Sequence, residues 1–207
     1  MTASALFWDK IAQKYAKDPV PNEQIYQKKL SITQEYLGPH SQVLELACGT
    51  GTTALHHAAK AGHIRATDIS ENMLAIAREK QQAAGVSNVD FECVSLEHID
   101  YQPGSYDMVM AHSILHLVDD REQALARIYD MLKPGGIFIS STACLGNGYS
   151  WLKLLVPLMK VIKKWPAVYF FKDKLLAQEI GKKGFEILQH WLPEKGPAVF
   201  IVAKKPQ

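Results

Sequence analysis

Residues 42–54 read QVLELACGTGTTA, and this stretch decides the fold. Its apolar run at 43–46 predicts a buried strand. Two glycines follow, Gly49 and Gly51, and their missing Cβ atoms let the chain bend sharply and let a ligand reach the backbone. Residues 53–60 then favour a helix, which Gly62 ends. A strand, a glycine turn and a helix N-terminus are typical of a unit that holds a nucleotide or an anionic group against backbone N–H donors.

An acidic residue, Asp68, strengthens this interpretation. Residues 62–69 predict a second short strand that ends at Asp68. In nucleotide-binding βαβ units, a carboxylate about 20 residues after the first glycine binds the ribose hydroxyls. Residues 49–54, GTGTTA, also satisfy the dinucleotide fingerprint. Two interpretations therefore compete: a nicotinamide-dependent oxidoreductase and an enzyme that uses S-adenosylmethionine.

Glu45 favours the second interpretation. It lies at the end of the first predicted strand, where a dinucleotide would place its pyrophosphate, and like charges in a partly dry site repel strongly. S-adenosylmethionine has no phosphate and carries an ammonium and a sulfonium, which an acid attracts. Residues 45–51, ELACGTG, resemble motif I of class I S-adenosylmethionine-dependent methyltransferases. The first glycine of that motif is Ala47 here, a departure that slightly narrows the approach to the cofactor.

Length and composition are those of an ordinary globular protein. The 207 residues suffice for one α/β domain, and a net charge of +2 is too small to indicate nucleic-acid binding. Cys48, Cys93 and Cys144 are far apart and lack metal-ligand spacing, so we expect no metal and a reducing, cytoplasmic location. Asp9 and Lys10 interrupt any apolar start, and no apolar run is long enough to span a membrane.

Two helices are expected before the first strand, at 5–17 and 23–37, as a helical cap over residues 1–40. Residues 7–15, FWDKIAQKY, resemble the N-terminal helix of small-molecule methyltransferases related to the quinone-biosynthesis enzymes. That resemblance implies that Tyr15 covers the methionine end of the cofactor. Core packing is the alternative role for Tyr15.

The adenine end of the site is predicted from the next two units. Ser70 caps a helix over 71–84, and beside it Ile69 and Met73 could sandwich an adenine ring, with core packing as the alternative. After the strand at 89–94 the family usually has an acid, but Ser95 and Leu96 stand there. The cofactor-binding residues predicted from motifs and resemblance are Tyr15, Glu45, Ala47, Cys48, Gly49, Gly51, Asp68, Ile69, Met73, Ser95, Leu96 and His112.

The rest of the chain continues the alternation of strands and helices. Strands are expected at 106–111 and 137–141, and residues 132–136, LKPGG, are similar to the turn that follows the family's fifth helix. A closing hairpin over 185–203 supplies the antiparallel last strand that the resemblance implies. The predicted fold is an α/β, Rossmann-like, doubly wound sheet of seven mostly parallel strands with helices on both faces, in one domain over residues 1–207.

Residues 145–172 are the least typical segment, because they hold many large apolar side chains interrupted by lysines. They occupy the place of the family's variable substrate-binding insertion. We expect a lid over the acceptor, with Trp151, Tyr169 and Phe170 as substrate contacts, or alternatively a helix that extends the core. The composition suits an acidic, amphiphilic acceptor and transient contact with an anionic membrane surface.

Methyl transfer is the predicted reaction, from S-adenosylmethionine to a small or lipid-like acceptor, leaving S-adenosylhomocysteine. Such an enzyme mainly aligns its reactants and excludes water. His112 and His116 are candidate bases or positioning groups, although each could be structural. A nicotinamide-dependent oxidoreductase and a non-catalytic cofactor-binding protein are the alternatives, and we expect a monomer or homodimer.

Overall fold

The computed structural model describes residues 2–20, 22–151, 167–193 and 196–207. Its strands are β1 (Gln42–Leu46), β2 (His63–Asp68), β3 (Val89–Cys93), β4 (Tyr106–His112), β5 (Leu132–Ala143), β6 (Glu186–Trp191) and β7 (Ala198–Lys204). Its helices are α1 (Ala3–Lys17), α2 (Glu23–Gln34), α3 (Thr52–Ala58), α4 (Glu71–Ala84), α5 (Arg121–Met131) and α7 (Asp173–Lys182).

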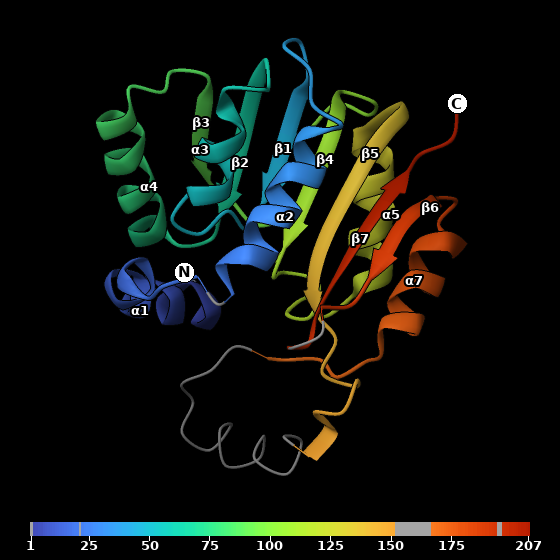
Figure 1. Ribbon diagram of the computed structural model, residues 1–207. Helices are drawn as coiled ribbons and strands as arrows, with labels where there is room; N and C mark the ends of the chain where they lie inside the picture. The colour runs from blue at the N-terminus through green and yellow to red at the C-terminus, as the bar shows by residue number, and fades with distance from the viewer. Residues whose placement is uncertain (1, 21, 152–166, 194–195) are drawn as a thin grey trace.

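The strands form one seven-stranded sheet in the order β3-β2-β1-β4-β5-β7-β6 (Figure 1). β1 pairs in parallel with β2 and β4, and the parallel ladder continues to β3 on one side and to β5 on the other. β7 is antiparallel to both β5 and β6. The predicted Rossmann-like sheet with an antiparallel last strand is therefore confirmed.

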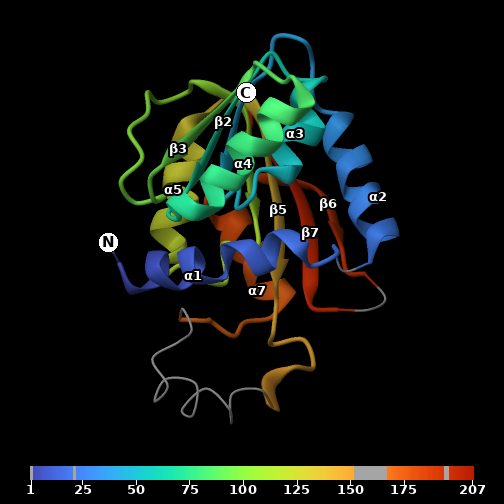
Figure 2. The same cartoon turned by 90° about the vertical axis from the view of Figure 1, so that its left-hand side faces the viewer.

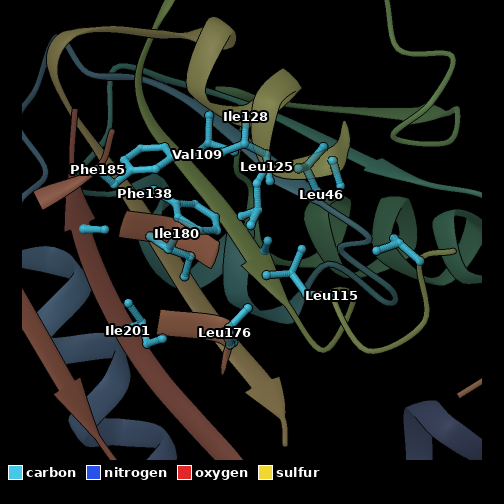
Figure 3. Packing of buried hydrophobic residues seen from close by; sticks show 14 of the residues in the cluster. Leu46, Val109, Leu115, Leu125, Ile128, Phe138, Leu176, Ile180, Phe185 and Ile201 are labelled. Carbon is cyan, nitrogen blue, oxygen red and sulfur yellow. The ribbon is translucent and has the colours of Figure 1, made fainter. Parts of the chain in front are cut away.

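Two apolar clusters hold helices on the two faces of the sheet. Alternation along β1 sends Leu44 and Leu46 into one cluster and Val43 into the other. The first cluster packs α5 and α7 against the sheet, and its fully or nearly buried members include Leu46, Val109, Phe138, Ile201, Leu125, Ile128, Leu176 and Ile180 (Figure 3). The second cluster packs α2, α3 and α4 on the opposite face, with Ile32, Ala54, Ala58 and Leu74 among its members.

Local sequence signals account for the limits of α4. The Ser70 hydroxyl accepts a hydrogen bond from the backbone N–H of Met73 at 3.1 Å, and Gly85 ends the helix with a φ of +65°. Both ends lie where the sequence predicts them. This matters for the site because Ser70 follows Asp68 closely and fixes the path of the chain at the end of β2.

β5 begins earlier than the sequence suggests. The expected turn at 132–136 belongs to the strand, because Leu132 pairs with Tyr106 and the C-terminal tail extends the ladder. The N–H of Gly135 donates to the carbonyl of Lys205 at 2.9 Å, and the N–H of Lys205 donates to the carbonyl of Gly136 at 2.9 Å. A φ of +77° at Gly135 lets the strand bend there.

The two N-terminal helices occupy different places. α1 lies at the carboxyl-end edge of the sheet, below α4 and on the side of β3 and β2, and it packs against α4 (Figures 1 and 2). α2 packs on a face of the sheet beside α3 (Figure 1). Among the described residues, no helix has both the length and the apolar character needed to cross a membrane.

Candidate functional site

A cavity of about 1540 Å³ lies at the carboxyl ends of the parallel strands. In open α/β sheets this edge is the usual ligand site. The cavity walls come from α1, α2, the β1–α3 loop, the ends of β2 and β4, and the segment after β3. All the predicted cofactor residues except Gly51 line it, namely Tyr15, Glu45, Ala47, Cys48, Gly49, Asp68, Ile69, Met73, Ser95, Leu96 and His112.

The loop after β1 has an unusual backbone. Ala47, Gly49 and Gly51 all have left-handed φ angles, of +53°, +55° and +71°. This conformation is unfavourable by about 1–2 kcal/mol for an L-residue, so Ala47 is strained where the motif's usual glycine would not be. The departure at Ala47 therefore affects the backbone itself.

Gly51 differs from its neighbours because it is not among the residues that line the cavity. A Cβ at this position would approach the Phe91 ring to 2.7 Å and the Ala77 side chain to 2.8 Å. The missing side chain therefore allows α3, α4 and β3 to pack closely. The structure supports a packing role for Gly51, and its predicted cofactor contact stays a prediction.

Asp68 ends β2 with a carboxylate that is already oriented. One oxygen accepts the N–H of Gly49 at 2.9 Å, and the other accepts the N–H of Ser70 at 2.9 Å. Burial raises the pKa of Asp68, while the N–H donors of Ser70, Gly49 and Ile69 act in the opposite direction. A carboxylate has about four lone-pair sites, so these three donors leave room for one further hydroxyl. Asp68 thus suits a ribose hydroxyl.

Asp9 fixes α1 over this end of the site, a contact that the sequence analysis missed. Its carboxylate accepts hydrogen bonds from the Ser70 hydroxyl at 2.7 Å and from the N–H of Asn72 at 3.1 Å. An acid at the first turn of α4 is favourable because it satisfies free N–H donors there. Asp9 itself lies within the predicted first helix. Its position in the sequence therefore gives no sign that it caps the N-terminus of α4.

Tyr15 projects from α1 towards the glycine loop. The residue is 49% exposed, and its ring approaches the Gly49 position, at 3.8 Å from the site of a Cβ there. The pKa of its phenol is raised by desolvation and by the negative charges of Asp68 and Glu45. Tyr15 therefore lies at the cavity wall, where the resemblance predicts it, and its exposure argues against a core role.

Glu45 is the most deeply buried acid of the site. It is 2% exposed, and its Oε2 atom has no hydrogen-bond partner within the part of the chain that the structure describes. Burial, and secondarily the charge of Asp68, raises the pKa of Glu45 to about 8, against which the N–H of Ala54 acts. At neutral pH the carboxyl is therefore largely protonated. The repulsion of a pyrophosphate is consequently weaker than the sequence argument assumed.

The opposite wall carries the predicted adenine contacts. Met73 is buried against α1 with Ala12 and Ile76, so it combines core packing with a place on the cavity wall. The Ser95 hydroxyl is hydrogen-bonded to Nδ1 of His98 at 2.9 Å. Leu96 is buried, and its carbonyl accepts a hydrogen bond from Arg127 at 3.1 Å.

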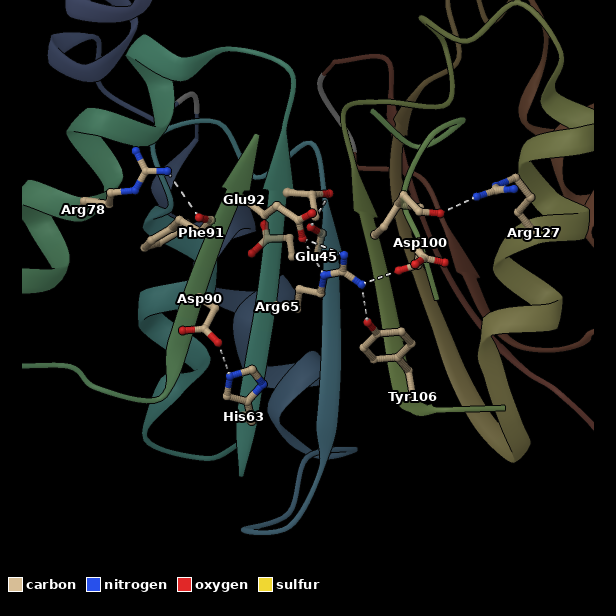
Figure 4. Close-up of polar contacts among 12 residues, drawn as sticks. Glu45, His63, Arg65, Arg78, Asp90, Phe91, Glu92, Asp100, Tyr106 and Arg127 are labelled. Atoms are coloured by element: carbon tan, nitrogen blue, oxygen red, sulfur yellow. Dashed lines mark hydrogen bonds and ion pairs between the residues drawn. The ribbon is translucent and has the colours of Figure 1, made fainter. Parts of the chain in front are cut away.

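Arginines hold the segment that carries these residues. Arg65 of β2 donates to the Glu92 carboxylate at 2.8 Å, to the carbonyl of Asp100 at 2.7 Å and to the Tyr106 hydroxyl at 3.2 Å (Figure 4). Arg127 of α5 donates to the carbonyl of Ile99 at 2.7 Å. The connection between β3 and β4 is thereby fixed at several backbone positions, which pre-organises the wall around Leu96.

The two predicted histidines lie in different places. His112 ends β4 and lines the cavity, whereas His116 is not among the lining residues and its Nδ1 is buried without a partner in the described residues. The carbonyl of His116 accepts the N–H of Tyr169 at 2.9 Å. The geometry therefore supports a site role for His112 and a structural role for His116.

Two polar residues of the cavity were missed by the sequence analysis. His57 of α3 is 0% exposed, and neither ring nitrogen has a partner among the described residues. Lys29 of α2 donates to the Ser141 hydroxyl at 2.7 Å. Burial lowers the pKa of His57 to about 4 and that of Lys29 to about 8. Lys29 lies on a helix with no motif, so the sequence offers no signal for it.

The predicted substrate residues do not line the cavity. Trp151 is 60% exposed, and residues 152–166 of the predicted lid lie outside the described residues. Tyr169 packs against the cluster of α5 and α7, and its hydroxyl donates to Asp119 at 2.6 Å. Tyr169 and Phe170 therefore belong to the described residues 167–172, which contact the α5 side of the sheet through Tyr169. Of these residues, only Ala167 lines the cavity.

Comparison with known proteins finds similarity to methyltransferases. Residues 43–136 match the family model described as a methyltransferase domain. The chain is 33% identical over 113 residues to the ubiquinone/menaquinone biosynthesis C-methyltransferase UbiE of Hydrogenovibrio crunogenus, covering 53% of this chain and 44% of that protein. It is 30% identical over 168 residues to phosphoethanolamine N-methyltransferase 2 of Caenorhabditis elegans, covering 79% of this chain and 37% of that protein.

The solved structure of the [4+2]-cyclase SpnF has the same fold, with a TM-score of 0.74 at 18% identity over 92% of this chain and 85% of that one. Fold, motif I and the domain match agree with one another. Residues 43–136 match a methyltransferase domain, and the sheet order and motif I are those of the class I S-adenosylmethionine-dependent fold. The chain spans about a quarter to a half of the length of the curated relatives it matches.

Proposed function

We propose that this protein transfers a methyl group from S-adenosylmethionine to a small-molecule acceptor. The observation that carries the proposal is the pair of acids at the ends of β1 and β2. Asp68 presents an oriented carboxylate, and Glu45 presents a buried oxygen without a protein partner in the described chain. A ligand with a ribose diol and an ammonium group would satisfy both. S-adenosylmethionine has both of these groups.

The residues present fit this cofactor. Asp68 would accept from the ribose hydroxyls, Glu45 would face the ammonium directly or through water, and the backbone at Gly49 lies open to the ligand. Ile69 and Met73 would contact the adenine, with Ser95 and Leu96 beyond them. Once bound, the cofactor supplies an activated methyl group on a sulfonium. The protein's task is then to align the acceptor and exclude water.

The acceptor side is proposed to lie over β4 and β5, where His112 and Lys29 line the cavity. Burial, together with His57 and Lys29, lowers the pKa of His112 to about 3. The imidazole is therefore neutral at physiological pH and can accept a proton or a hydrogen bond. The relatives include a ubiquinone/menaquinone biosynthesis C-methyltransferase and a phosphoethanolamine N-methyltransferase, so we propose a small acceptor without assigning the atom methylated.

The test compares two ligands and then a reaction. Calorimetric titration should show binding of S-adenosylhomocysteine and none of NAD. Binding of NAD with no binding of S-adenosylhomocysteine would overturn the proposal in favour of an oxidoreductase. Methyl transfer from labelled S-adenosylmethionine to any member of a panel of phenols, carboxylates, amines and quinols would then separate an enzyme from a non-catalytic binding protein.

A further inference from the structure

The cavity contains a cation for which the described part of the chain supplies no acidic partner. Lys29 points from α2 towards β5, where its ammonium donates to the Ser141 hydroxyl at 2.7 Å. Within the described ranges, no carboxylate forms a hydrogen bond or an ion pair with it. Burial lowers the pKa of Lys29 to about 8, so it is still mainly charged at neutral pH. A desolvated charge without a counter-charge is unfavourable unless a ligand supplies one.

The neighbouring residue Lys28 shows that this orientation is not general for α2. Lys28 extends over the Trp191 ring at 4.6 Å and is not among the cavity-lining residues. Lysines usually place the ammonium in water and leave the stem on apolar surface. Lys29 instead brings its ammonium to a serine at the cavity wall, 5.9 Å from the centre of the Phe200 ring.

Two neutral imidazoles accompany Lys29. Ser141 lies opposite His112 in the β4–β5 register, so the ammonium is held next to the end of β4. His57 also lines the cavity and is 0% exposed, and both of its ring nitrogens lack partners in the described part of the chain. Each neutral imidazole offers one donor and one acceptor. An unpartnered imidazole, buried and on the cavity wall, is a second feature that indicates a polar ligand.

We propose that the acceptor presents a singly charged anionic oxygen to Lys29 and Ser141, with His57 or His112 donating a further hydrogen bond. This inference rests on the proposed function and deepens it by giving the chemical class of the acceptor. A single ammonium with a hydroxyl and imidazole donors matches the charge and hydrogen-bonding needs of one oxyanion. A carboxylate and an ionised phenol share this chemistry, and the experiment distinguishes them.

The experiment uses the full chain, with and without S-adenosylhomocysteine, and four small probes. Benzoate is compared with its neutral isostere benzamide, and 4-nitrophenolate with nitrobenzene. Affinities are measured by following the imidazole resonances of His57 and His112 by NMR, assigned with single histidine variants. We expect at least one anion to bind about tenfold or more tightly than its neutral partner, because a charge-assisted hydrogen bond is among the strongest.

Variants then locate the anion. Lys29→Met should lower the affinity for the anionic probe about tenfold and leave the affinity for the neutral probe unchanged. Lys29→Arg should retain part of the affinity for the anionic probe. Lys28→Met is the matched control and should have no effect, and Ser141→Ala gives a second, smaller perturbation should Lys29→Met fold poorly. Benzoate preference identifies a carboxylate, and nitrophenolate preference an ionised hydroxyl.

Three results would overturn the inference. They are equal binding of anionic and neutral probes, no shift of either imidazole in the millimolar range, and equal losses in the Lys28 and Lys29 variants. Failure of S-adenosylhomocysteine to bind would instead refute the proposed function. The two failures are distinguishable because the anion titration is also run without the cofactor product.

Discussion

Cofactor binding should expel a proton from Glu45, and Glu45→Gln should abolish this release. Burial raises the pKa of Glu45 to about 8 in the protein without ligand. An ammonium group beside the carboxylate stabilises the ionised form and lowers that pKa. The cofactor therefore binds best after the proton has left, and binding is linked to pH.

The size of the effect follows from the pKa. With a pKa of about 8, roughly 0.9 of the Glu45 carboxyls are protonated at pH 7. If the bound state holds the carboxylate ionised, binding at pH 7 releases about 0.9 proton per site. Affinity should accordingly rise by up to about tenfold per pH unit as the pH approaches 8, and level off above it. The amide of the Glu45→Gln variant cannot titrate, so the affinity of that variant should vary little over this range.

Calorimetry in buffers of different ionisation enthalpy measures the proton release directly. S-adenosylhomocysteine is titrated into the parent and into Glu45→Gln. It is also titrated into the control Glu122→Gln, whose exposed carboxylate pairs with Lys183 outside the cavity. Glutamine resembles the protonated acid in shape, so the Glu45→Gln variant should melt close to the parent at pH 7. Equal proton release from the parent and the Glu45→Gln variant, or none from either, would refute the reasoning.

Four further substitutions test the site. Asp68→Ala should weaken binding of S-adenosylhomocysteine by tenfold to a hundredfold, about 1–3 kcal/mol, and unchanged calorimetric affinity would contradict the ribose assignment. Gly51→Ala should lower stability by about 1–3 kcal/mol in a thermal melt through contact with Phe91 and left-handed strain, with little effect on the affinity of the folded protein. Ala47→Gly should be neutral or stabilising by up to about 1 kcal/mol in chemical denaturation, because it relieves the strain at φ +53°. Tyr169→Phe should cost about 1 kcal/mol of stability through the lost bond to Asp119, whereas a lid role alone would change turnover and leave the melting temperature intact.

Sequence reasoning succeeded where the signal is local. The apolar run before Gly49 and the Ser70–Gly85 limits of α4 each depend on residues within a few positions of one another. The place of Asp68 at the end of β2 follows from the same local spacing. Such patterns fix strand ends, and parallel pairing then gathers those ends at one edge of the sheet. This is why most of the residues predicted from these motifs line one cavity, while their contact with a cofactor stays a prediction.

The other half depends on contacts between distant segments. Lys29 and Ser141 are 112 positions apart, and only the packing of α2 across the face of the sheet brings them together. His57 lies on a short helix whose buried side also faces the core, so its pattern does not distinguish a cavity wall from packing. Glu45 was placed correctly, but its protonation depends on burial, which a sequence does not give.

The strand order arranges charge across the cavity. Asp68, Glu45, His112 and Ser141 come from β2, β1, β4 and β5, which are consecutive neighbours in the sheet. Strands about 4.8 Å apart place the first and last of these about 14 Å from one another. Acids thus occupy one end, the Lys29 ammonium the other, and a neutral imidazole stands between them. A cationic ligand over β1 and an anionic one over β5 are each matched, and exchanging them would place like charges together. If the proposed assignments hold, the residues that bind each partner would also exclude it from the other's position, so the donor and the acceptor would be oriented without a separate selectivity element.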